Sequence, residues 1–210
     1  MWLIRLMRSF AIALNLAWIL LATAHAEESS ASREAMKVVV EKASTNTTLP
    51  LFRAWITSGT DKFTFLVPEG FYIRAAPSQD RLKLANKAGD CQIAFALLHI
   101  TPSDTGELKP EICRELLLSR HPGAKVLEEF PEHAAGQEGL GYDLQWETPE
   151  HLAYRIRTVF VPFASGVWEF TTTTVPKKFP EGRAGLHTLI LTFRASAGGV
   201  LEVRPLPDRL

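Results

Sequence analysis

The stretch that decides the fold is residues 140–174, LGYDLQWETPEHLAYRIRTVFVPFASGVWEFTTTT. Apolar and polar side chains alternate along most of it, a period of two that is typical of β-strands with one buried face. The alternation is interrupted at residues 148–150 and at residues 162–166, where the composition is typical of turns. We therefore predict three antiparallel strands joined by two short connections.

The turn positions also predict a register for this three-strand meander. Consecutive residues of a strand point to opposite faces, so a slip of one residue would move a whole set of apolar side chains to the other face. The chosen register keeps the apolar side chains together on one face. The predicted cross-strand neighbours are Leu144 with Tyr154, Asp143 with Arg155, Phe160 with Trp168, Thr158 with Phe170, and Arg155 with Thr173.

The other face of the meander is predicted to be polar. Its charged side chains are Asp143, Arg155, Arg157 and Glu169. One interpretation is a recognition surface for a partner. The alternative is a set of solvated cross-strand ion pairs, each worth about 0–1 kcal/mol.

The remainder of the chain predicts further strands and two helices. Alternating or continuous apolar runs indicate strands at residues 52–56, 63–67, 71–74, 81–86 and 91–100. Pro110 suits the first turn of a helix that ends near His121. A second helix is predicted at residues 185–194, with Leu186, Leu189, Ile190 and Phe193 as its buried stripe.

Residues 1–26 have the pattern of a secretory signal peptide. Arg5 and Arg8 precede an apolar stretch at residues 10–21, and Ala24-His25-Ala26 is typical of a cleavage site. An uncleaved anchor is the alternative, but a membrane span needs about 20 apolar residues. The pattern predicts a periplasmic or secreted protein without a transmembrane span in the mature chain.

The domain organisation follows from this leader and from the composition. Residues 27–49 are predicted to be a flexible lead-in, with one helical turn or an added strand as alternatives, and residues 50–197 a single α+β domain. Residues 198–210 form a Gly- and Pro-rich tail.

The two cysteines, Cys91 and Cys113, are predicted to pair because an exported protein meets an oxidising compartment. Cys91 begins an apolar run and Cys113 lies on the apolar face of the first helix, so the helix could bring them together. Such a bridge would contribute roughly 3 kcal/mol. Two buried free thiols are the alternative.

The composition argues against several functions. Lys plus Arg and Asp plus Glu both number 23, so no basic excess favours nucleic acid. Ser165 lacks the Gly-x-Ser-x-Gly setting of a hydrolase nucleophile, and Asp104-Thr105-Gly106 has ordinary turn composition. No two histidines after residue 26 have the local spacing of a zinc pair. We predict no catalytic residue, metal or cofactor.

Three stretches resemble the PsbP-like family of secreted α+β domains, which includes bacterial periplasmic relatives of the DcrB type. They are residues 63–71 (FTFLVPEGF), 166–171 (GVWEFT) and 189–194 (LILTFR). The resemblance implies an antiparallel sheet packed by two main helices, and an accessory domain often without known activity. Fold alone does not decide function.

Two functions remain as hypotheses. The first is an exported, non-catalytic accessory or binding module of the cell envelope, whose partner is an envelope protein or a small ligand. The alternative is a periplasmic hydrolase whose site is assembled only in three dimensions.

Overall fold

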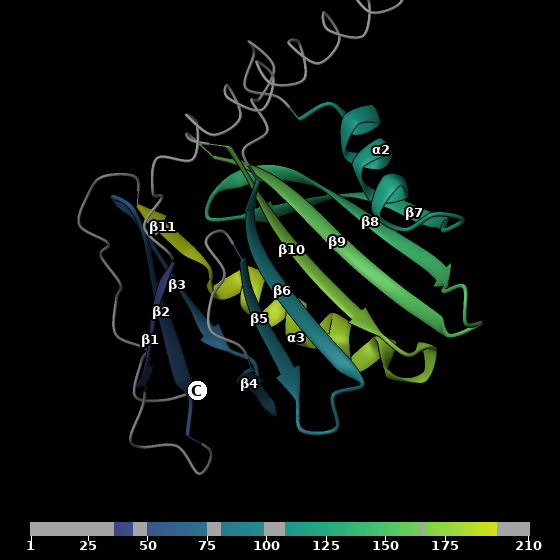
Figure 1. Cartoon of the computed structure of the whole chain (residues 1–210). Helices are drawn as coiled ribbons and strands as arrows, with labels where there is room; N and C mark the ends of the chain where they lie inside the picture. The colour runs from purple at the N-terminus through teal and green to yellow at the C-terminus, as the bar shows by residue number, and fades with distance from the viewer. Residues whose placement is uncertain (1–35, 44–49, 75–80, 99–107, 164–165, 197–210) are drawn as a thin grey trace, which may run out of the picture. The chain divides into compact units, whose positions relative to one another are not determined.

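The computed structural model describes residues 36–43, 50–74, 81–98, 108–163 and 166–196 (Figure 1). Several sequence predictions lie outside these residues: the signal peptide at 1–26, most of the lead-in, the tail at 198–210, Ser165 and Asp104. They stay predictions.

The first of two antiparallel sheets joins the two ends of the described chain. Its strand order is β1-β2-β3-β11, with β1 at Lys37–Lys42, β2 at Phe52–Ser58, β3 at Asp61–Val67 and β11 at Arg194–Ser196. Strand β1 falls inside the predicted lead-in and is the added strand that the sequence left open.

The second sheet has seven strands in the order β4-β5-β6-β10-β9-β8-β7 (Figure 1). Their bounds are β4 Phe71–Ile73, β5 Arg81–Asn86, β6 Cys91–Leu98, β7 Lys125–Ala134, β8 Gln137–Glu147, β9 Ala153–Phe163 and β10 Gly166–Thr174. Every pairing is antiparallel. Together with the helices, the two sheets confirm the α+β class.

Two helices pack on this large sheet. Helix α2 (Pro110–Arg120) has the predicted bounds, and His121 is its C-cap. Helix α3 (Phe179–Thr192) begins six residues before the predicted start, directly after a 3-10 turn, η2 (Pro176–Lys178). All four residues of its predicted stripe are buried: Leu186, Leu189, Ile190 and Phe193.

The main core lies where α3 contacts the large sheet and β3 of the small sheet. Trp168 is 1% exposed, and its ring lies 4.3 Å from that of Phe163 and 4.8 Å from that of Phe193. Phe63 brings the small sheet into the same aromatic cluster, 5.8 Å from Phe95. We call this side of the large sheet the α3 face.

A smaller core lies on the opposite side, which we call the α2 face. Cys113 and Leu117 of α2 pack against Tyr142, Leu144 and Ile156. Both faces of the large sheet are therefore covered by a helix, including the face of the meander that was predicted to be polar and solvated.

This double covering explains why the predicted meander register is wrong. Between β8 and β9 the true partners are Leu144 with Ile156 and Asp143 with Arg157, a shift of two residues that keeps the faces. Between β9 and β10, Trp168 faces Val161 instead of Phe160, a shift of one that changes the face. Residues 156–161 are all buried, so alternation could not show which side chain points which way.

Strands β7 and β11 were also missed. Strand β7, KVLEEFPEHA, contains a proline and three glutamates and shows no clean alternation. It is the last strand of the large sheet, and edge strands tolerate proline and charge that a central strand would exclude. The predicted meander of three strands is therefore a meander of four.

Candidate functional site

A groove of about 590 Å³ opens between β7 and α3 on the α3 face. We call it the α3–β7 groove. Its volume lies within the range of small-ligand sites, about 300–1,000 Å³. Its lining combines charged and apolar side chains: Glu128, Phe130, Glu132, Arg157, Phe179, Pro180, Arg183, Ala184, Leu186, His187 and Ile190.

A buried ion pair lies at the inner end of this groove. Arg157 of β9 donates from Nε to Oδ1 of Asp143 at 2.6 Å and from Nη2 to Oδ2 at 2.8 Å. The two side chains are 10% and 5% exposed. The hydrogen bonds to Asp143 raise the pKa of Arg157 above its usual value despite burial. Adjacent strands place these two residues directly opposite each other.

Aromatic rings fix the guanidinium from the sides. The Arg157 Cζ lies 4.4 Å from the ring centroid of Phe130 and 6.0 Å from that of Phe179. Gly141 makes the Phe130 contact possible, because a Cβ at Gly141 would overlap the Phe130 ring. A bidentate partner and stacked rings together hold Arg157 in one orientation.

One wall of the groove carries carboxylates and the other carries basic side chains. Glu128 and Glu132 come from β7, and Arg183 and His187 come from successive turns of α3. A carboxylate oxygen of Glu128 lies 3.9 Å from Arg157 Nη2, which is beyond hydrogen-bond distance. The Arg157–Asp143 pair adds no net charge.

The structure separates the four residues of the predicted recognition surface. Asp143, Arg155 and Arg157 lie on the α3 face, but Glu169 lies on the α2 face, where its Oε2 accepts from Arg120 Nη1 at 2.6 Å. Asp143, Arg157 and Glu169 are buried instead of solvated. A single polar outward face does not exist, because each side of the sheet is covered by a helix.

Arg155 takes a different position from Arg157. Its guanidinium lies 4.4 Å from the ring of Phe179, and it does not line the groove. Its Nε is buried with no hydrogen-bond partner among the described residues. Arg155 therefore packs beneath the start of α3.

The predicted disulfide is absent, and Cys91 and Cys113 are free, buried thiols. Cys91 belongs to the core of the α3 face and Cys113 to that of the α2 face, so the large sheet lies between them. Burial raises the pKa of each thiol to about 11. Thiols of this kind are poor nucleophiles at neutral pH.

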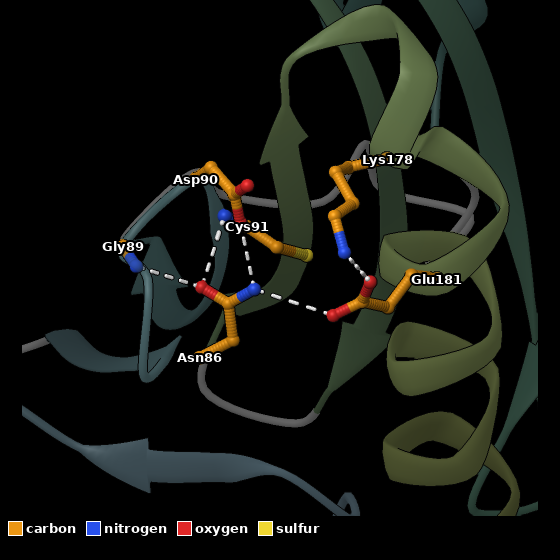
Figure 2. Close-up of polar contacts among 6 residues, drawn as sticks. All are labelled: Asn86, Gly89, Asp90, Cys91, Lys178 and Glu181. Atoms are coloured by element: carbon orange, nitrogen blue, oxygen red, sulfur yellow. Dashed lines mark hydrogen bonds and ion pairs between the residues drawn. The ribbon is translucent and has the colours of Figure 1, made fainter.

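A second polar cluster attaches the start of α3 to the β5–β6 turn (Figure 2). Asn86 Nδ2 donates to Asp90 at 2.8 Å and to Glu181 at 3.2 Å, while its Oδ1 accepts from the backbone of the turn. Lys178 Nζ donates to Glu181 at 2.6 Å. Cys91 adjoins this cluster and donates its backbone N–H to Asn86 Oδ1 at 3.3 Å, as Figure 2 shows. The arrangement is that of a structural tether.

A third feature is an apolar groove of about 630 Å³ beside the small sheet. Exposed Val40, Phe52 and Tyr72 line it, together with residues 67–71. No signal in the sequence analysis pointed to this groove or to the α3–β7 groove. The α3–β7 groove brings together a strand and a helix that are distant in sequence, whereas the residues that line the apolar groove all fall between Val40 and Ile73.

In the described ranges, no group of three or more His, Cys, Asp or Glu side chains is placed to hold a metal ion. No helix there has the length and apolar character that crossing a bilayer requires.

No protein-family profile matches the chain, and no curated protein matches it. Several solved structures are similar in fold. The cyanobacterial PsbP of Synechocystis is 10% identical, over 80% of this chain and 96% of that one, with a TM-score of 0.46. The Ran-binding protein Mog1p of Saccharomyces cerevisiae is 11% identical over 78% and 97%, also at 0.46.

LpqN of Mycobacterium tuberculosis, described as involved in cell envelope biogenesis, is 8% identical over 77% of this chain and 91% of that one, with a TM-score of 0.41. A PsbP protein is thus among the structural neighbours, in line with the sequence resemblance. At these identities and TM-scores, the neighbours assign this chain to no family and carry no argument about its function.

Proposed function

We propose that the chain is an exported accessory module of the cell envelope that binds a segment of a partner protein in the α3–β7 groove, without transforming it. The signal-peptide pattern at residues 1–26 supports export. The observation that carries the binding site is Arg157, a buried arginine whose orientation is fixed and which lines an open groove.

Arg157 keeps hydrogen-bonding capacity for a ligand. A guanidinium has five N–H groups, and the two hydrogen bonds to Asp143 use one on Nε and one on Nη2. Within the described residues, the next carboxylate is Glu128, too distant for a hydrogen bond. A carboxylate or carbonyl oxygen entering the groove would therefore meet donors that are already oriented.

The two walls favour an occupant of mixed charge. Arg183 and His187 suit an acidic group, and Glu128 and Glu132 suit a basic one. Between them, Phe130 and Ile190 offer apolar contact. A polypeptide segment that carries both charges next to an apolar side chain combines these properties, whereas a simple anion would be repelled by the two glutamates.

The test places a photo-crosslinking amino acid at Arg183 and, as a control, at Glu150, an exposed residue of the β8–β9 loop. In cells, we expect the Arg183 position to give a discrete protein adduct that the Glu150 position does not give. Adding Glu132→Arg should remove that adduct without changing the melting temperature.

Adducts that are the same from both positions, or that persist in Glu132→Arg, would exclude the groove as the binding site. Export is tested separately by the mass of the purified protein, which should begin at Glu27. The alternative of a periplasmic hydrolase has no specific observation in its favour.

A further inference from the structure

Among the four sheet edges formed by the described residues, β1 is the one whose sequence leaves it open to pairing. Strands β4 and β11 are three residues long. Strand β7 carries Pro131 and a bulge between Val126 and Glu128. Such features are the usual protection of an edge against another chain. Strand β1 has six residues, KVVVEK, with no proline and no bulge.

The outer edge of β1 exposes apolar side chains and main-chain groups. Val39 is 55% exposed and Val40 is 46% exposed. In the described part of the chain, β1 pairs with β2 alone. Within the described ranges, the sheet order therefore ends at β1, and no strand pairs with the other side of its backbone.

The hydrogen-bond pattern shows which residues offer that backbone. Ala43 N–H donates to the carbonyl of Leu51 at 2.7 Å, in the same register as the β1–β2 ladder. Backbone groups alternate in direction along an antiparallel strand. Odd-numbered residues of β1 therefore point their N–H and C=O toward β2, and Val38, Val40 and Lys42 point theirs outward.

This alternation restricts how two copies of β1 could pair antiparallel. Directly opposite residues must both point outward or both inward, so an even-numbered residue must face an even-numbered one. When Val38 faces Val40 of the second copy, Val39 lies on the two-fold axis and Lys37 faces Glu41 at both ends. The next allowed register in one direction places Val39 opposite Lys37, and in the other direction opposite Glu41. In neither of them does Lys37 face Glu41.

We propose that two copies of this chain associate through β1, antiparallel about a two-fold axis at Val39, so that the two small sheets become one continuous sheet. Opposite charges at both ends and valines in the centre are the complementarity that such a pairing needs. Glu41 also accepts from Trp55 Nε1 at 3.0 Å, which positions its carboxylate on the face that it shares with Lys37. This inference is independent of the α3–β7 groove.

The first test measures the mass of the purified protein in solution over a range of concentrations. We expect a dimer at high concentration. Val40→Pro should abolish it, because it removes an N–H that points away from β2, and Val40→Thr, which keeps that N–H, should not. Both variants should keep the melting temperature of the monomer.

A charge exchange tests the register. Lys37→Glu alone should abolish the dimer by placing glutamates opposite each other, and Lys37→Glu combined with Glu41→Lys should restore it. Val39→Cys should give a disulfide-linked dimer on oxidation, since opposite residues of a non-hydrogen-bonded pair have Cα atoms about 4.5 Å apart. Thr60→Cys, in an exposed turn, should not.

A protein that stays monomeric at every concentration would overturn the proposal, as would a dimer that survives Val40→Pro. If the combined charge exchange does not restore the dimer and Val39→Cys gives no crosslink, the stated register is wrong, and with it this interface.

Discussion

Each face of the large sheet holds an arginine–carboxylate pair, and the two pairs differ in burial and in what they connect. On the α3 face, Arg157 and Asp143 join adjacent strands through two hydrogen bonds, and both are at most 10% exposed. On the α2 face, Arg120 joins a helix to β10 through Glu169, and Arg120 is 31% exposed. The first pair shapes the sheet and the groove, and the second docks a helix.

Losing one partner should therefore cost much more on the α3 face. Removing one member of a buried pair leaves a charge without water or partner, at about 3–5 kcal/mol. We expect Asp143→Ala to lower the free energy of unfolding by that amount, measured by urea denaturation. Combining Asp143→Val with Arg157→Met should recover most of the loss. A small effect of Asp143→Ala would mean that Arg157 reaches water through the groove.

The tether of α3 in Figure 2 gives the next largest effect. Asn86→Asp removes the amide donors to Asp90 and Glu181 and adds a third carboxylate. We expect a loss of about 1–3 kcal/mol at neutral pH, measured by thermal or urea unfolding. Asn86→Ala serves as the control that loses the donors without adding charge.

The direction in which the effect of Asn86→Asp changes with pH follows from Glu181. Hydrogen bonds from Lys178 and then Asn86 lower the pKa of Glu181 below its ordinary value of 4.5. A lowered carboxylate pKa contributes stability above the unfolded pKa, and this is lost as the pH falls through the folded pKa. The loss in free energy of unfolding caused by Asn86→Asp should thus become smaller below about pH 4.5. The loss caused by Asn86→Ala should decrease less.

On the α2 face, Glu169→Gln should cost less. The amide keeps a hydrogen bond to Arg120, and the partly exposed guanidinium can still reach water. We expect a loss of about 1–2 kcal/mol in the free energy of unfolding. If Glu169→Gln proved as damaging as Asp143→Ala, the two faces would not differ in the way described.

At neutral pH the two thiols give the smallest effect, because they are protonated in both the folded and the unfolded chain, and they should behave alike on both faces. Their pKa rises from 9.0 to about 11 in the folded chain, so stability should fall as the pH rises between these values, where unfolded thiols ionise first. Cys113→Ala should flatten this decline in alkaline urea titrations. In the unfolded, unreduced protein both thiols should react with iodoacetamide, and a detected disulfide would contradict the structure.

Features that depend on a single helix or strand could be predicted from the sequence. Features that depend on what covers the two faces of the sheet could not. The buried stripe of α3 and the bounds of α2 follow from helical periodicity and from Pro110. The register at Trp168 does not, because a strand covered on both sides has no polar face to mark its orientation. Asp143 and Arg157 were named from their charge and alternation. Their burial beside Phe130 depends on Gly141 and on β7, which no local pattern revealed.

The pairing of β11 with β3 brings the last described residues beside some of the first. Ala195 lies opposite Phe63, and Thr192 Oγ1 accepts from the Leu66 N–H across 126 positions. Contacts of such sequence separation form slowly, because a long loop must close before they contribute. During folding, Phe63 and Phe65 must therefore wait for α3 before they can be buried. The small sheet is completed only when the chain as far as Ser196 takes part in folding.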